Sequence, residues 1–192
     1  MVSRWPPEQI SPKNVSLDIS RCHDYPPAVK TVQQDIKQNK PFRTLAEEAY
    51  IALRLTSEVV DPPWAKYLRK HYGISPSQYN LLRILRGAGA DGRTMTEISE
   101  RMINRDPDVT RLADRTVKLG YARRMQDTAD RRVVKLFVTA KGLELLAELD
   151  DDVYVFLDRA LGAMPTKRLE LLRDLLNEAR ASFRSFPAEE EG

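Results

Sequence analysis

The stretch from Asp127 to Thr139 constrains the fold of this chain more than any other segment. It opens with the charged sequence Asp-Thr-Ala-Asp-Arg-Arg and continues into a run of valine, leucine and phenylalanine that is interrupted by Lys135. A polar tip that leads into an apolar, alternating run is typical of the turn and returning strand of a β-hairpin. We therefore expect residues 121–125 and 133–138 to form two paired strands.

Two short helical patterns lie just before this hairpin. Thr94 and Glu97 have the spacing of a capping box at the start of a helix, and Ile98 and Met102 are expected to point inward from that helix. The next helix is expected to begin at Asp106-Pro107, with the aspartate as N-cap and the proline in the first turn. Its expected apolar face is Val109, Leu112, Ala113 and Val117. Two helices followed by a charged hairpin are typical of a winged helix-turn-helix.

Further helical patterns precede these elements. Apolar residues recur near the helical period from Thr44 to Val60, and Asp61-Pro62-Pro63 is expected to end that helix, because proline disfavours a helical residue before it. A separate short helix is expected over 64–72, closed by Gly73. Ser75-Pro76 then provides the N-cap and first residue of another helix.

Two leucine-rich patterns follow the hairpin. Residues 139–161 and 165–183 each repeat large apolar residues at helical spacing, and Met164-Pro165 separates them. The expected stripe on the first of these helices is Leu143, Leu146, Leu149, Val153, Phe156 and Leu157. The expected fold class is therefore mainly α with a small β-wing.

Charge is distributed unevenly, although the formal net charge is only +3. Residues 101–135 hold ten Lys or Arg against five Asp or Glu, whereas residues 143–192 hold six against twelve. A basic middle and an acidic end indicate that one face meets a polyanion such as duplex DNA and that another does not.

The chain is expected to divide into three parts. Residues 1–42 contain six of the twelve prolines and form an arm that is either flexible or packed on a partner subunit, with a short helix possible within 28–40. Residues 43–186 are expected to form the main domain, with a DNA-binding lobe at about 75–138. Residues 187–192 are expected to be a disordered tail.

Several other classes of protein are disfavoured. The single cysteine, Cys22, excludes a disulfide within the chain and fits a reducing cytoplasm. The sequence has no apolar run of transmembrane length and no secretory signal, so we expect a cytoplasmic, nucleoid-associated protein. It also lacks a phosphate-binding loop, a dinucleotide fingerprint and a His-Glu-x-x-His motif. We therefore expect no enzyme activity, no cofactor and no metal site.

The segment from Thr94 to Gly142 resembles the MarR family of bacterial transcription regulators. The matching stretches are Thr94–Met102, Asp108–Arg115, Leu119–Arg124, the wing pattern Asp127-x-x-Asp130-Arg131-Arg132 and the closing Val138-Thr139-Ala140-Lys141-Gly142. One departure is Ile103, where family members commonly have glycine, and Asn104 is expected to supply the left-handed turn residue instead. With the flanking helices, the resemblance covers roughly residues 43–184.

This resemblance implies a winged helix-turn-helix with N- and C-terminal dimerisation helices. It implies a homodimer that binds a pseudopalindromic operator in double-stranded DNA, usually as a repressor, and that is released by a small aromatic or oxidising effector. The alternative is a winged-helix protein-interaction module that has lost specific DNA binding, with the N-terminal arm as its working surface.

The expected DNA contacts come from the second helix and the wing. In a helix-turn-helix the N-terminal residues of the second helix face base edges. The candidates are Thr110, Arg111 and Arg115 on that helix and Arg123, Arg124 and Arg131 as phosphate contacts. A solvated charged face is the alternative for these residues.

Three further residues complete the expected DNA site. Asp130 and Arg132 are two apart and would project to the same side of an extended strand, so that the carboxylate could orient the guanidinium. By family resemblance, Arg132 would then enter the minor groove. Asp114 is expected to orient an arginine, either Arg115 or one in the wing.

The family resemblance implies an effector site that lies between the dimerisation helices and the winged lobe. Its candidate residues are Arg54, Trp64, Tyr67 and His71. Aromatic walls with one cation would suit an aromatic carboxylate. The alternative is that these residues serve only ordinary packing and dimer contacts.

Overall fold

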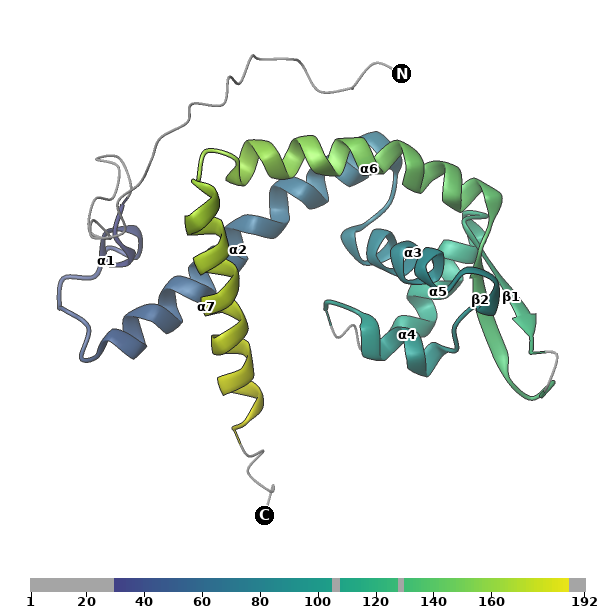
Figure 1. Ribbon diagram of the computed structural model, residues 1–192, viewed down its shortest axis with the longest axis horizontal. Helices are drawn as coiled ribbons and strands as arrows, with labels where there is room; N and C mark the ends of the chain where they lie inside the picture. Colours follow the sequence, from purple (N-terminus) through teal and green to yellow (C-terminus); the bar gives the residue numbers. More distant parts are fainter. Residues whose placement is uncertain (1–29, 105–107, 128–129, 187–192) are drawn as a thin grey trace. The chain divides into compact units, whose positions relative to one another are not determined.

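The computed structural model describes residues 30–104, 108–127 and 130–186 (Figure 1). The described residues fall into two compact units, one ending at Asp150 and the other beginning at Asp151. Within these ranges, no helix combines the length and the apolar character that crossing a membrane requires. The expected disordered tail and most of the expected arm lie outside the described residues.

The structure is mainly helical with one small sheet, which confirms the expected fold class. Its elements are α1 (Val32–Asp35), α2 (Leu45–Tyr72), α3 (Pro76–Ala88), the short 3-10 helix η2 (Gly89–Asp91), α4 (Met95–Arg101), α5 (Val109–Lys118), β1 (Ala122–Gln126), β2 (Val134–Val138), α6 (Ala140–Leu161) and α7 (Thr166–Arg184).

The expected helix ends are observed where a polar side chain or a glycine dictates them. Ser75 and Thr94 each accept a hydrogen bond from the third backbone N–H of their helix, and both form complete capping boxes. Gly73 closes α2 with φ of 68°, a left-handed conformation that glycine adopts at little cost.

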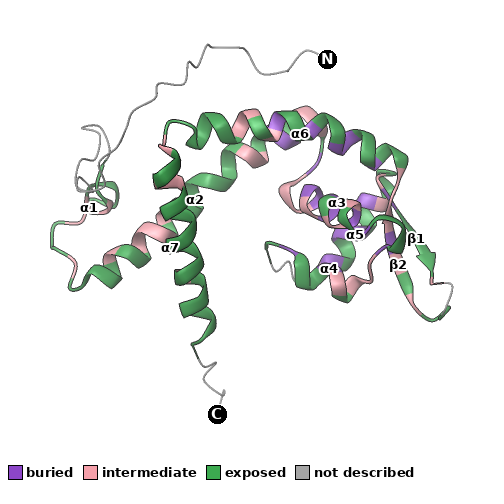
Figure 2. Cartoon of the chain, in the orientation of Figure 1, coloured by how far each residue is buried: buried purple, intermediate pink, exposed green. Residues whose placement is uncertain are grey.

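One hydrophobic core joins α3, α4, α5 and the hairpin. Its buried members are Leu81, Leu85, Ile98, Met102, Val109, Leu112, Ala113, Ala122 and Leu136. Figure 2 shows buried residues in these elements and also along α6. Of the inward positions expected on α4 and α5, Ile98, Met102, Val109, Leu112 and Ala113 are buried, and Val117 is partly buried against the same core.

The hairpin is the expected wing. Strands β1 and β2 are antiparallel, and Arg124 is paired with Leu136. Arg93 forms an isolated antiparallel bridge with Leu136 of β2, because the N–H and C=O of Arg93 both hydrogen-bond the backbone of Leu136. Gly92 makes this possible, since a Cβ at that position would overlap the Phe137 ring.

The expected break at Asp61-Pro62-Pro63 was wrong. Helix α2 runs without interruption from Leu45 to Tyr72 and contains both prolines. Each proline removes one donor from the helical hydrogen-bond ladder and disfavours the preceding helical residue, but it does not forbid a helix. The flanking turns hold the helix together, because Tyr67 and Leu68 on the C-terminal side are buried in the fold.

The start of the second helix of the expected helix-turn-helix also differs from expectation. The expected N-cap and first residue, Asp106 and Pro107, lie outside the described residues, and α5 begins at Val109 with Asp108 as its N-cap. Asn104 does not have a positive φ, so it is not the left-handed turn residue. Helix α4 ends instead at an extended residue, since its C-cap Met102 has φ of −63° and ψ of 135°.

Helix α6 passes from the first unit into the second. Within the first unit it is tied to α3 by Arg86, whose guanidinium contacts both oxygens of Asp150 at 2.7 and 3.0 Å. Of the expected apolar stripe, Leu146 and Leu149 are buried and Leu143 and Leu157 are exposed, while Leu145, outside that stripe, is also buried.

Candidate nucleic-acid interface

Helix α5 has one apolar and one polar face. Val109, Leu112 and Ala113 are in the core, and Thr116 is buried with its hydroxyl donating to the Leu112 carbonyl at 2.8 Å. The three residues expected to contact DNA from this helix, Thr110, Arg111 and Arg115, are all exposed. The packing of α5 therefore directs these side chains outward.

Asp108 fixes both the start of α5 and the side chain of Arg111. One carboxylate oxygen accepts the Arg111 backbone N–H at 3.0 Å, and the other lies 2.9 Å from the Arg111 Nε. The acid at the N-terminus of α5 is thus neutralised by an arginine and by the helix amides. It orients Arg111 rather than leaving an isolated negative charge on this face.

Asp114 pairs with an arginine of the wing. Its Oδ1 lies 2.7 Å from the Nη1 of Arg124 on β1. Of the two partners expected from the sequence, Arg115 and a wing arginine, the structure has the second. This ion pair joins the exposed face of α5 to the first strand of the wing.

Asp127 organises the base of the wing tip. Its carboxylate accepts the Asp130 backbone N–H at 3.1 Å and pairs with the Lys135 ammonium. The hydrogen bond that the Lys135 ammonium donates to Asp127 raises the pKa of Lys135 above its ordinary value. The role of Asp127 was not expected from the sequence; its signal was the Asp-x-x-Asp spacing, which suits a side chain that bonds a backbone amide ahead of it in a turn.

The expected side-chain pairing of Asp130 with Arg132 was wrong. Residues 131 and 132 form a turn and not an extended strand, since β2 begins only at Val134. The Asp130 carboxylate instead accepts the backbone N–H of Arg132 at 2.9 Å. Arg131 and Arg132 are both exposed on this turn.

The remaining wing candidate, Arg123, lies on the outer face of β1. Its guanidinium carbon is 5.8 Å from the centre of the Phe137 ring, which faces it across the hairpin. We refer to the exposed arginines of α5, β1 and the wing tip together as the basic surface. Its members are Arg111, Arg115, Arg123, Arg124, Arg131 and Arg132.

Three of the four expected effector residues come together, but as a packed cluster. Trp64 stacks on Tyr67 with ring centres 5.9 Å apart, and His71 lies 4.6 Å from Tyr67. Tyr79 of α3 packs edge-on against Trp64 at 5.7 Å, and burial raises the pKa of Tyr79. Arg54 is not part of this cluster; it is exposed and lies 3.9 Å from Glu58.

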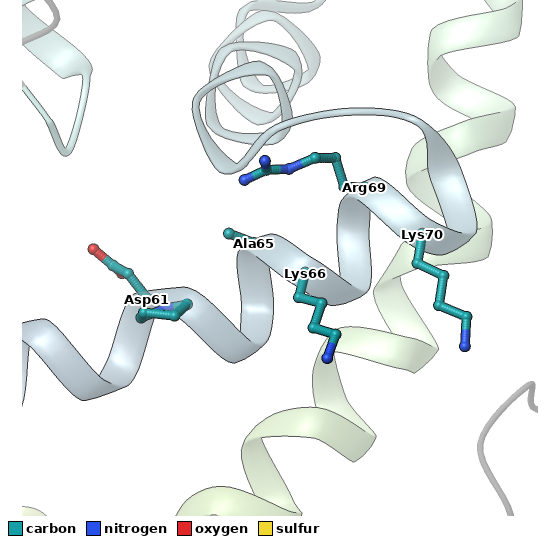
Figure 3. A pocket seen from close by; sticks show the side chains of 6 residues that line it. Asp61, Ala65, Lys66, Arg69 and Lys70 are labelled. Carbon is teal, nitrogen blue, oxygen red and sulfur yellow. The ribbon is translucent and has the colours of Figure 1, made fainter.

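A hollow of about 690 Å³ lies on another face of α2 (Figure 3). It is lined by Asp61, Pro62, Ala65, Lys66, Arg69 and Lys70, and by none of the expected effector residues. Figure 3 shows Lys66 and Lys70 extending to one side while Arg69 runs back above Ala65. In the part of the chain that the structure describes, no group of three or more His, Cys, Asp or Glu side chains could hold a metal ion.

A winged helix with outward arginines on its second helix and wing defines a class of DNA-binding regulators. Comparison with known proteins also finds DNA-binding regulators. A model of the MarR family matches residues 72–133. The transcriptional regulator MhqR of Bacillus subtilis is 20% identical over 137 residues, which are 71% of this chain and 92% of MhqR.

Solved structures of MarR regulators are also similar to this chain. A MarR transcription factor from Planctomyces limnophilus is 32% identical, with a TM-score of 0.54 over 71% of this chain and 98% of that one. Sco3205 from Streptomyces coelicolor, a MarR regulator solved in complex with DNA, has a TM-score of 0.66 at 19% identity, over 80% of this chain and 96% of its own.

The chain belongs to the MarR family. It is a DNA-binding transcriptional regulator and not an enzyme, as expected from the sequence.

Proposed function

We propose that the protein is a homodimeric repressor that occupies a pseudopalindromic operator in double-stranded DNA and is released by a small-molecule effector. The observation that carries this proposal is the basic surface, in which Asp108 and Asp114 hold two arginines in place. Oriented guanidiniums on a helix and a neighbouring wing suit phosphates and guanine edges.

Helix α5 is the reading element of this proposal. Its first turns would enter the major groove, with Thr110, Arg111 and Arg115 near base edges or phosphates. Val109 and Leu112 on the opposite face are anchored in the core, so the helix is presented on a rigid support.

The wing would contact the DNA beside this groove. Arg123, Arg124 and Arg131 would neutralise phosphates, which supplies affinity without sequence information. Arg132 at the turn would enter the minor groove, where narrow A·T stretches attract arginine. Asp130 supports this role by holding the backbone of Arg132 at the tip.

The proposed homodimer rests on apolar surface that remains exposed in the single chain. The exposed large apolar residues of α6 and α7 include Tyr154, Leu157, Leu161, Leu171, Leu172, Leu175, Leu176 and Phe183. An apolar surface of this extent marks an interaction site. A second copy of the chain would cover it and would place two α5 helices on two half-sites about 34–36 Å apart.

Effector release would act through the aromatic packing between α2 and α3. The cluster of Trp64, Tyr67 and His71 connects α2 with α3, so an aromatic effector that inserts between these rings would disturb the support of the winged lobe. Arg54 would serve such a ligand only from a separate position on α2.

Capture of fragmented genomic DNA on the purified protein tests the function directly. Wash salt is stepped from about 50 to 200 mM, a range in which phosphate contacts weaken strongly. We expect retention of a few fragments that share a pseudopalindrome. Equal loss of all DNA with salt would contradict sequence-specific regulation, and no retention at all would favour a protein-interaction module.

A further inference from the structure

Three consecutive backbone carbonyls after α5 accept hydrogen bonds from the beginning of α6. The Leu119 carbonyl accepts from the Lys141 ammonium at 2.9 Å. The Gly120 carbonyl accepts from the Thr139 hydroxyl at 2.7 Å, and the Tyr121 carbonyl accepts from the Thr139 backbone N–H at 3.0 Å. We call residues 119–121 and 139–142, which make these contacts, the α5–α6 latch.

Lys141 is the only side-chain cation in the latch. Its ammonium bonds the carbonyl of the residue that ends α5, where the helix dipole favours a positive charge. The same ammonium lies 4.8 Å from the centre of the Tyr121 ring. Lys141 therefore contacts both α5 and the segment that enters the wing.

Gly142 brings the two elements into direct contact. A Cβ at this position would overlap the Tyr121 carbonyl oxygen and lie 2.8 Å from the Val138 side chain. The Gly142 N–H donates to the Thr139 hydroxyl oxygen at 3.1 Å, so one hydroxyl both caps α6 and bonds Gly120. Thr139, Lys141 and Gly142 of the Thr-x-Lys-Gly sequence therefore hold the start of α6 against the segment that follows α5.

We propose that the latch, through Lys141, sets the position of α5 for operator reading, so that a displacement of α6 is transmitted to α5. This inference rests on the proposed function of α5 as the reading helix. Helix α6 is continuous from Ala140 to Leu161, and its later part carries apolar residues of the proposed dimer surface. Lys141 is thus a positioning residue that acts through α5 and not a DNA contact.

The test compares three variants of the full-length protein. Lys141→Met keeps the apolar stem beside Tyr121 and removes the ammonium, whereas Lys141→Arg keeps a donor. Lys118→Met is the matched control, because it removes the neighbouring exposed cation of α5, for which no ion pair is found among the described residues. Each variant is titrated with the captured operator and with a non-operator duplex of equal length over a range of salt.

We expect Lys141→Met to weaken operator binding at least ten-fold, to change non-operator binding less than two-fold and to leave the salt dependence unaltered. Lys141→Arg should retain most of the operator preference. Equal weakening on both duplexes with a shallower salt slope would identify Lys141 as a phosphate contact and overturn the proposal.

Amide hydrogen exchange without DNA separates this proposal from the proposed function. Lys141→Met should accelerate exchange at Leu119, Gly120 and Tyr121 and in the last turn of α5, but not in α4. Unchanged exchange would overturn the latch whatever the DNA result, and faster exchange with normal operator binding would overturn its positioning role. A wild-type protein without operator preference would contradict the proposed function, and the exchange result would still decide whether the latch exists.

Discussion

At the scale of single residues, two acids beside the basic surface are paired with arginines. Asp108 holds Arg111, and Asp114 holds Arg124 at 2.7 Å. Exposed ion pairs contribute little to stability. Their value here is orientation, because a guanidinium held in one position loses less conformational freedom on binding.

Asp114→Asn is therefore expected to weaken operator binding by about ten-fold, equivalent to about 1.4 kcal/mol. Removal of a negative charge would by itself strengthen binding to a polyanion, so the two explanations differ in sign. Glu100→Gln, at an exposed acid of α4, is the matched control and should bind as well as wild type or slightly more tightly. Tighter operator binding by Asp114→Asn in a titration would refute the orienting role.

Arg132→Ala is expected to weaken DNA binding by about ten-fold without lowering the melting temperature, since each contact to a base or phosphate contributes about 1–3 kcal/mol and Arg132 is exposed. Loss of a minor-groove contact should also reduce the preference for A·T pairs beside the half-site. Binding as tight as wild type would show that the wing tip does not contact DNA there.

At the scale of elements, short helices depend on their caps. Helix α4 extends only from Met95 to Arg101, and Thr94 and Glu97 satisfy two of its first amides reciprocally. The Thr94 backbone N–H holds the pKa of Glu97 below its ordinary value, with a smaller contribution from the Thr94 hydroxyl. Because α4 packs against α5, this cap is part of what positions the proposed reading helix.

Thr94→Ala should lower the free energy of unfolding by about 1 kcal/mol in denaturant titrations. Because the folded-state pKa of Glu97 is depressed, its stabilisation is present above the ordinary value of 4.5 and is lost as the pH falls through the folded-state value. The stability difference between wild type and Glu97→Gln should therefore shrink in acid. A difference that does not change with pH would rule out the carboxylate as the source.

At the scale of the whole molecule, the proposed operator binding depends on the assembly of two chains. Leucines of α7, among them Leu172 and Leu176, remain exposed in the single chain. Because a pseudopalindrome requires two α5 helices, the proposed dimer would couple DNA binding to the covering of this apolar surface.

Leu172→Glu/Leu176→Glu should convert the dimer to a monomer in sedimentation experiments and reduce operator binding in parallel. A buried carboxylate without a partner is strongly unfavourable, and the affected positions do not lie in the core of the winged lobe. Asn177→Glu places the same charge beside this apolar face and should remain dimeric. A double variant that is still dimeric would move the dimer surface away from α7.

The sequence by itself determined the local features of this protein. Capping residues such as Ser75 and Thr94, the glycine after α2 and the alternating run of the wing strand each specify their structure within a few residues, so they could be predicted. The inward and outward faces of α5 followed in the same way from helical periodicity.

Only the tertiary structure decided which distant groups meet. Burial of Tyr67 and Leu68 keeps α2 helical through Pro62 and Pro63, against the local preference. The partner of Asp114 depended on where β1 passes α5, and the Asp130 carboxylate bonds the backbone because the tip turns before β2 begins. The contacts of Lys141 with Leu119 join residues 22 positions apart, so no local pattern could specify them.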